Sequence, residues 1–408
     1  MKKFVFAVVT VLFFAIPIFA PREASAVPAF ARQTGMACNT CHFQHFPILN
    51  AFGREFKAGG FTMVGGQSLV EGDILSMPAV LNASLVTKIR YQKTDGDNDD
   101  SGTNRGEIQF PDEAALFLGG RIGEHIGFIL ETQLKDAGSS NFASFKVPIT
   151  YDYAGMHFEA VPFTTDAFGP QFSFELLNTG AVRNIRVLEH RKGISSVQYV
   201  GLQHEAQGFG FVAYHNTGHI NYTAWQPEVG TSDAFPLLNY LRVAATPTVA
   251  GWDLAAGGQW WSGTYKSGAT TRQKAEGWAV DAQAQGMVVT LPLGVYLSYA
   301  KAEGSKANEP ANIFNSNAGD AAAWSILAEL GVLPNRVTVA TGYRAGDSGA
   351  VGPSEQDELV FGATFLVTQN FELQINHSSF FGDWYDVPAN NELSDGDQLT
   401  TLMIFAAF

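Results

Sequence analysis

Apolar and polar residues alternate over much of the chain beyond Pro78. Between Phe371 and Asn376, Phe, Leu and Ile occupy every second position, and Glu, Gln and Asn lie between them. The run from Phe128 to Leu134 shows a similar alternation. Because successive side chains of a strand point to opposite faces, such runs have one apolar and one polar face. This pattern is typical of strands that face lipid on one side and the lumen of a transmembrane β-barrel on the other.

The connections between these runs fall into a short class and a long class. The short connections are Arg121–His125, Gln207–Phe209, Val249–Asp253, Leu291–Gly294, Leu333–Arg336 and Thr368–Asn370. The long, polar connections are Thr94–Gly106, Asn216–Asp233, Gly263–Lys274, Ala302–Asp320, Ala345–Gln356 and Gly382–Asp397. The two classes largely alternate, as do the periplasmic turns and external loops of a membrane barrel, whereas a soluble β-sandwich has no reason to sort its loops by length.

The length of the strand region sets the size of the barrel. About 330 residues, at roughly 20 for each strand with its connection, allow about 16 antiparallel strands, an even number that leaves both termini in the periplasm. No strand register can be assigned between Thr165 and Gly193, a region that corresponds to up to two strands. We therefore predict a mainly β fold, with a porin-like barrel over residues 78–408 surrounded by outer-membrane lipid.

The chain ends in an alternating run that predicts a final strand. Leu402, Ile404, Ala406 and Phe408 share one apolar face, and the other face is mixed rather than strongly polar. A last strand that ends on an aromatic residue resembles the recognition signal of bacterial outer-membrane barrels. An ordinary buried strand at the end of a soluble protein would share only the alternation.

The first residues have the three parts of a secretory signal. The basic start Met1-Lys2-Lys3 is followed by an apolar run over residues 4–20 and by small residues that end at Ala26. The apolar run is broken by Pro17 and falls short of a membrane-spanning helix, which weighs against the alternative of an uncleaved anchor. We predict that residues 1–26 are a signal peptide, cleaved near Ala26, and that the protein is exported to the outer membrane.

Composition supports an exported β protein and excludes two other classes. Gly accounts for 42 residues and Phe for 32, yet the mean hydropathy is only +0.01. No stretch after the signal reaches the ~18 consecutive apolar residues that indicate a membrane helix. The net charge of −14 makes the chain a poor binder of nucleic acid and a favourable neighbour for cations.

One short motif carries specific chemistry. Cys38-Asn39-Thr40-Cys41-His42 has the C-x-x-C-H spacing of a c-type haem attachment site. In such a site, two thiols bond to the vinyl groups of one haem and the adjacent imidazole binds the iron. The alternative, a redox-active Cys-x-x-Cys pair, needs a thioredoxin-like βαβ context that the sequence lacks. We predict one covalent haem c, with thioether bonds to Cys38 and Cys41 and His42 as an axial ligand.

Apolar residues continue past the motif at helical spacing. They are Phe43, Phe46, Leu49, Phe52 and Phe56. Pro47 is tolerable in the first turn of a helix, and Gly59-Gly60 can end it. So short a helical segment cannot bury enough surface to fold alone. We therefore expect the haem segment, residues 27–77, to plug the lumen of the barrel.

The motif does not specify the second axial ligand or the residues that would pair with the haem propionates. We favour Met63 because a chain reversal after the predicted helix could bring its thioether over the haem; Met36, Met77 or an open position are alternatives. His45 lies three residues past His42, on the same side of a helix, and is a poor candidate. The cations near the motif that could pair with the propionates, or lie free on the surface, are Arg32, Arg54 and Lys57.

The run from Pro28 to Lys57 resembles the N-terminus of a known family. That family is the fused monohaem cytochrome–porins of bacterial outer membranes, the type that serves as iron oxidase in iron-oxidising bacteria. The specific likeness covers residues 28–63; beyond it only length, strand pattern and the C-terminal Phe408 are alike. The resemblance implies an Fe(II)-oxidising oxidoreductase in which the C-x-x-C-H residues bind haem, external Fe(II) donates one electron, and a periplasmic cytochrome accepts it.

Other functions and sites stay open at this point. The chain could be a diffusion porin whose haem segment is a plug or sensor, or it could take electrons from a donor other than iron. The carboxylates of Asp95–Asp100 could hold a divalent cation, although the loop lacks the Gly and distal Glu of an EF-hand. His215 and His219 have the spacing of helical metal ligands, but the Gly between them argues against a helix.

Overall fold

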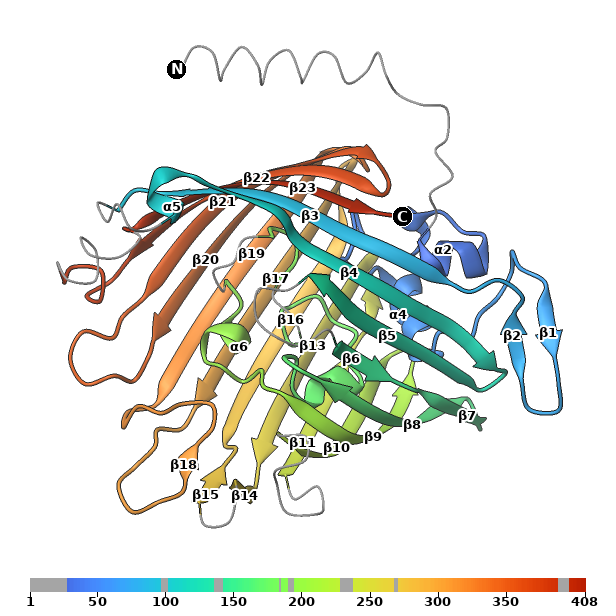
Figure 1. The fold of residues 1–408 in the computed structure, drawn as a ribbon, viewed down its shortest axis with the longest axis horizontal. Helices are drawn as coiled ribbons and strands as arrows, with labels where there is room; N and C mark the ends of the chain where they lie inside the picture. The colour runs from blue at the N-terminus through green and yellow to red at the C-terminus, as the bar shows by residue number, and fades with distance from the viewer. Residues whose placement is uncertain are drawn as a thin grey trace.

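The computed structural model describes residues 28–96, 102–135, 142–182, 185–189, 194–227, 238–267, 271–387 and 396–408. Its strands close into one antiparallel barrel, in which the last wall strand pairs with the first (Figure 1). The wall strands in chain order are β3 (Ala83–Thr94), β4 (Glu107–Gly123), β5 (Ile126–Lys135), β6 (Phe142–Lys146), β7 (Ile149–Tyr153), β8 (Met156–Thr165), β9 (Ala206–His215), β10 (Gly218–Gln226), β11 (Leu238–Ala245), β12 (Thr248–Val249), β13 (Trp252–Ser262), β16 (Gly277–Val288), β17 (Leu291–Ala302), β19 (Ala321–Leu333), β20 (Val337–Asp347), β21 (Asp357–Thr368), β22 (Phe371–Phe381) and β23 (Gln398–Ala407).

Two of these strands are interrupted. β6 and β7 both pair with β8, and β11 and β12 both pair with β13, so each pair is one wall strand in two pieces. The 18 labelled strands of the barrel therefore make 16 wall strands in the described part of the chain, as the sequence predicts. The same residues include no helix long and apolar enough to cross a membrane.

The alternation along the strands matches the two surfaces of the wall. On β22, Glu372, Gln374 and Asn376 are buried, whereas Ile375 between them is 48% exposed on the outer face. On β23, Met403 and Phe405 face inward and pack with Phe46 of the N-terminal segment. The mixed inner face of the last strand is thus the surface that receives this segment.

Short turns and long loops lie at opposite ends of the barrel, as predicted (Figure 1). Three expected connections are nevertheless wrong, because Gln207–Phe209 lies within β9, Leu291–Gly294 lies within β17, and Asn216–Asp233 contains β10. Glycine often marks a turn, but Gly208 lies within a strand. A Cβ there would come within 2.2 Å of the Ala224 carbonyl oxygen, so this glycine permits close strand approach rather than a turn.

Two small sheets lie beyond the wall, one at each end. A hairpin of β1 (Leu69–Glu71) and β2 (Ser76–Pro78) precedes the first wall strand at the short-turn end. At the long-loop end, β14 (Thr264–Ser267), β15 (Thr271–Lys274) and β18 (Ala311–Asn312) form a three-stranded sheet. The predicted loop Gly263–Lys274 therefore contains two short strands.

The region that resisted strand assignment is an insertion into the lumen. Residues 166–205, between β8 and β9, contain η2 (Pro170–Ser173) and α6 (Ser196–Tyr199) but no wall strand in their described parts. Hydrogen bonds tie this inserted segment to three strands: Ser173 to Thr223 of β10, Ser196 to Ser298 of β17, and the Val187 carbonyl to Gln374 of β22. Its apolar side chains are buried against the inner wall, which explains the apolar composition without a strand period.

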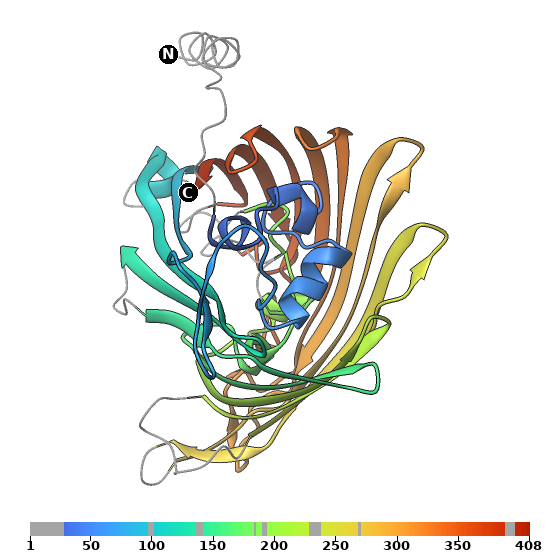
Figure 2. The same cartoon turned by 90° about the vertical axis from the view of Figure 1, so that its right-hand side faces the viewer.

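The N-terminal segment also lies inside the ring of strands, at the short-turn end (Figure 2). It forms α2 (Ala29–Thr34), α3 (Cys38–Cys41) and α4 (Ala51–Ala58). The single helix expected from Phe43 onward is wrong. The chain reverses at the bridge between His42 and Leu49, and α4 begins only where the Asn50 side chain accepts a hydrogen bond from the Gly53 amide at 2.9 Å. The helix ends at Gly59, as predicted.

Candidate functional site

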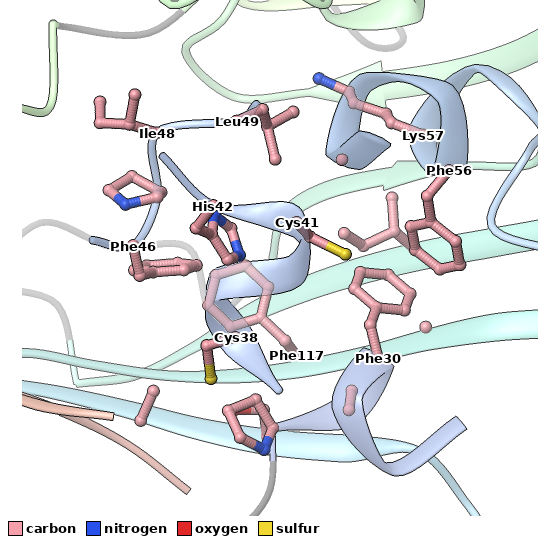
Figure 3. Close-up of a pocket in the computed structure, with 18 of the residues that line it drawn as sticks. Phe30, Cys38, Cys41, His42, Phe46, Ile48, Leu49, Phe56, Lys57 and Phe117 are labelled. Carbon is pink, nitrogen blue, oxygen red and sulfur yellow. The ribbon is translucent and has the colours of Figure 1, made fainter. Parts of the chain in front are cut away.

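A cavity of about 320 Å³ lies between the N-terminal segment, the inserted segment and the inner wall (Figure 3). Its wall side comes from β3, β4, β5, β6 and β23, near the short-turn end of the barrel. Its lining is mostly apolar and includes the phenyl rings of Phe30, Phe46, Phe56, Phe61, Phe117, Phe172 and Phe405. A largely apolar cavity of this size, with a few polar groups, is typical of a small-molecule or cofactor site.

The three residues of the haem motif all line this cavity. Cys38 and Cys41 lie at the two ends of α3, and His42 follows directly, so one helical turn brings them together (Figure 3). Neither cysteine is in a disulfide. Burial raises the pKa of both thiols, whereas a redox-active Cys-x-x-Cys pair works through a lowered thiol pKa. The environment therefore argues against the thioredoxin-like alternative.

The His42 ring has the form that a metal ligand needs. Burial lowers the pKa of His42 to about 4, although the carbonyls of Ile48 and Pro47 counter part of the shift. The imidazole is therefore neutral at neutral pH, and its Nδ1 atom is buried without a partner in hydrogen-bonding geometry. Gly53 lets α4 approach this turn, because a Cβ there would lie 2.1 Å from the Cys41 carbonyl oxygen. The donor set and its cradle fit a c-type haem.

Of the three cations predicted to meet propionates, only Lys57 lines the cavity. Arg54 is buried elsewhere and donates to both carboxylate oxygens of Asp253 at 2.6 Å. Arg32 donates to the Ala83 carbonyl at 2.8 Å. The structure adds two cavity-lining cations that the sequence analysis missed, Lys146 of β6 and Arg186 of the inserted segment. They lie more than 100 residues from the motif, and no local pattern signals them.

The methionines are placed differently from the prediction. Met63 is 39% exposed and lies outside the cavity lining, where its backbone carbonyl accepts a hydrogen bond from Gln33 at 2.7 Å. Met77 belongs to the hairpin of β1 and β2 at the short-turn end and is also exposed. Met36, two residues before Cys38, is the methionine that lines the cavity. The geometry therefore favours Met36 over Met63 as a thioether near the haem motif.

The N-terminal segment is fixed to the barrel wall by buried polar contacts. His45 Nε2 lies 2.7 Å from Glu329 Oε1, and both side chains are fully buried. Burial alone would lower the pKa of His45, but Glu329, with help from Glu372, raises it to about 10. The protonated His45 ring is thus ion-paired with a residue of the barrel wall, and it does not line the cavity. With Arg54 bound to Asp253 on another strand, these contacts hold the segment as a plug rather than a tethered domain.

The structure tests the weaker sequence signals for a metal site only in part. Residues 97–100 of the acidic loop lie outside the described residues. His215 is exposed and contacts Thr217, whereas His219 is buried in the lumen, so the two rings lie on opposite faces of the wall. The described residues contain no group of three or more His, Cys, Asp or Glu side chains arranged to hold a metal ion.

The fold has relatives among solved structures. The anion-selective porin from Comamonas acidovorans aligns with 81% of this chain and 99% of its own, at 12% identity and a TM-score of 0.52. OmpT of Vibrio cholerae, in its trimer form, aligns with 81% of this chain and 99% of its own, at 11% identity and a TM-score of 0.50. No protein-family model and no curated protein matches the sequence. The outer-membrane barrel expected from the sequence is confirmed at the level of the fold, which is that of the 16-stranded porins.

Proposed function

We propose that this protein is an outer-membrane c-type cytochrome that takes single electrons from external Fe(II) and passes them to a periplasmic carrier. One observation carries the proposal: Cys38, Cys41 and His42 come together on one wall of an apolar cavity inside a porin-like barrel. A haem c bound there supplies a one-electron redox centre. Iron as the donor rests on the resemblance of residues 28–63 to the cytochrome–porin family.

The chain's own groups support such a centre. The two thiols would hold it covalently and His42 would bind its iron, while the surrounding phenyl rings keep water away. Lys57 and Lys146 place positive charge at the cavity for two carboxylates, and Arg186 lines it too, although this residue is also ion-paired with Glu189 at 2.6 Å. The net charge of −14 of the whole chain raises the local concentration of cations such as Fe(II) and makes their approach sensitive to salt.

A diffusion porin with a haem-bearing plug or sensor is the second candidate, and the porin-like fold favours it. The packing of the lumen weighs in the other direction. Ile185 and Leu188 of the inserted segment are at most 2% exposed and lie in one buried apolar cluster with wall residues that include Tyr296 and Leu327. Together with the plug, this segment fills much of the space that a solute would use.

Reduction by Fe(II) separates the two candidates. The full-length, haem-loaded protein in detergent is mixed with Fe(II) without oxygen, and the haem absorbance is followed by stopped flow. We expect reduction on a timescale of seconds or faster, with dithionite defining full reduction. If dithionite reduces the haem and Fe(II) does not, the iron-oxidase proposal is wrong. A large, steady conductance of the same preparation in planar bilayers would favour the diffusion porin.

The position of Met36 gives a second test within the same site. If its thioether binds the iron, Met36→Leu lowers the haem midpoint potential, because thioether ligation raises it. The matched variant Met63→Leu removes a thioether outside the cavity and should leave the potential unchanged. Potentiometric titration of both variants measures this. An unchanged potential in Met36→Leu would show that this methionine is not a ligand.

A further inference from the structure

A small hairpin projects from the short-turn end of the barrel, beyond the wall strands (Figure 1). This rim hairpin comprises residues 69–81, including β1 and β2. It exposes an unusual share of its apolar side chains, namely Val70, Ile74, Leu75, Met77, Val80 and Leu81. Ile74 at the tip is 77% exposed. Exposed apolar side chains gathered in one short segment, away from the lipid-facing wall, indicate an interaction site.

The rim hairpin is held in a fixed orientation. A two-stranded hairpin alone is only marginally stable in water, so it needs external support. The Gly72 amide donates to the Leu75 carbonyl at 2.8 Å and closes the turn. Arg121 of β4 donates to the Ser76 carbonyl at 3.0 Å and to its hydroxyl at 2.7 Å. A preorganised surface of this kind loses little conformational entropy when a partner binds.

The base of the rim hairpin is coupled to the haem cavity through Gln33. This fully buried side chain donates to the Phe61 and Met63 carbonyls at 2.7 Å. Its Oε1 accepts from the Asn82 side chain at 3.0 Å and from the Arg121 amide at 3.1 Å. Gln33 belongs to α2, which also supplies Phe30 to the cavity lining. Hydrogen bonds of Gln33 therefore connect the helix that lines the cavity with the barrel rim at the base of the hairpin.

The charges on the rim hairpin indicate what binds there. Glu71 ends β1, Asp73 lies in the exposed turn, and the neighbouring β4–β5 turn adds Glu124, whose side chain is 77% exposed. Carboxylates at the tip would have to be desolvated in a lipid bilayer, which is costly. An apolar centre with an acidic edge instead matches a protein whose apolar patch is ringed by lysines.

We propose that the rim hairpin is the docking surface for a small, basic, soluble electron-carrier protein. The inference rests on the proposed function, since the carrier must meet the protein at the end of the barrel where the haem motif lies. Apolar contacts with Ile74 and Leu75 supply the buried centre of the interface. Asp73 and its neighbours steer a positively charged partner toward it, so association weakens as salt is added.

Binding of a basic probe protein tests this surface. Oxidised mitochondrial cytochrome c, which is basic and has an exposed haem edge, is titrated into the haem-loaded, full-length protein in detergent at low ionic strength. We expect Ile74→Ser/Leu75→Ser and Asp73→Lys each to weaken binding by about tenfold or more. The matched control Val289→Ser removes another apolar side chain, 94% exposed in a turn at the same end, and should change the affinity by less than about twofold.

The results distinguish three possible partners of the rim hairpin, which are a basic carrier protein, a lipid bilayer and a second copy of this chain. Equal binding by wild type and both hairpin variants, or equal binding of lysine-acetylated cytochrome c, would overturn the proposal. So would unchanged probe binding combined with poorer retention of Ile74→Ser/Leu75→Ser in phosphatidylethanolamine–phosphatidylglycerol vesicles, because the hairpin would then be a lipid anchor. A loss of oligomer size in that variant would assign the surface to a second copy. Reduction by Fe(II) is measured separately and does not use the hairpin, so docking and iron oxidation can fail independently.

Discussion

Replacing both Cys38 and Cys41 with alanine is expected to abolish covalent haem attachment. The two thiols are the only ones in the chain, so no other side chain can form the thioether bonds. Mass spectrometry of the denatured protein should find haem mass on the peptide containing residues 38–42 in the wild type and none in the variant. Asn39→Ala is the matched control, because it changes an exposed position inside the motif and keeps both thiols and His42.

The double variant should also accumulate at a lower level. The plug is short, and its three helices bury little surface by themselves, so covalent haem contributes to its folding. A wild-type protein that carries no haem mass on residues 38–42 would contradict the prediction, and with it the proposed function. The barrel, which rests on its own strand pairing, would be unaffected by that result.

The barrel could be predicted because its signals are local. The alternation on β22 follows from strand geometry, and the structure places its polar residues inward and its apolar residues outward as expected. On β23 the apolar face lies outward as well, but the mixed face that lies inward includes Met403 and Phe405. The connection predicted at Gln207–Phe209 is wrong because glycine occurs in turns and also inside strands, where it lets two strands approach closely. Gly208 lies in the predicted connection Gln207–Phe209, yet its missing side chain lets β9 approach β10, because a Cβ there would lie 2.2 Å from the Ala224 carbonyl oxygen.

The candidate site was predictable only where it is local in sequence. Adjacency within one helical turn fixes Cys38, Cys41 and His42 relative to one another. Lys146 and Arg186 come from a strand and from the inserted segment, so only the three-dimensional structure brings them to the cavity. Arg54 shows the converse, because a cation near the motif is bound to Asp253 across the lumen. Distance from the motif along the sequence does not show which cations line the cavity and which bind the barrel wall elsewhere.

The inserted segment is fixed to the wall by a buried charge network that the sequence did not indicate. Arg242 of β11 is fully buried between Asp281 of β16 and Glu175 of the inserted segment. One contact is a hydrogen bond of 2.8 Å from Arg242 Nη2 to Asp281 Oδ2, and Arg242 Nε lies 3.2 Å from Glu175 Oε2. Both carboxylates are at most 2% exposed in their side chains. A single guanidinium is therefore the counter-charge of two carboxylates that have almost no access to water.

Arg242→Leu is expected to destabilise the protein by about 3–5 kcal/mol, because removing one partner leaves buried carboxylates without a counter-charge. Urea unfolding in detergent, followed by the heat-modifiable shift on gels, measures the loss. The control Lys301→Leu breaks an ion pair with Asp320 that is partly exposed on both sides, and should cost less than about 1 kcal/mol. Adding Asp281→Asn to Arg242→Leu removes one of the uncompensated charges and should restore part of the stability. If Arg242→Leu lowers the free energy of unfolding no more than Lys301→Leu does, the charge network does not hold the inserted segment in the lumen. The packed interior, which distinguishes this barrel from an open porin, must then depend on apolar contacts alone.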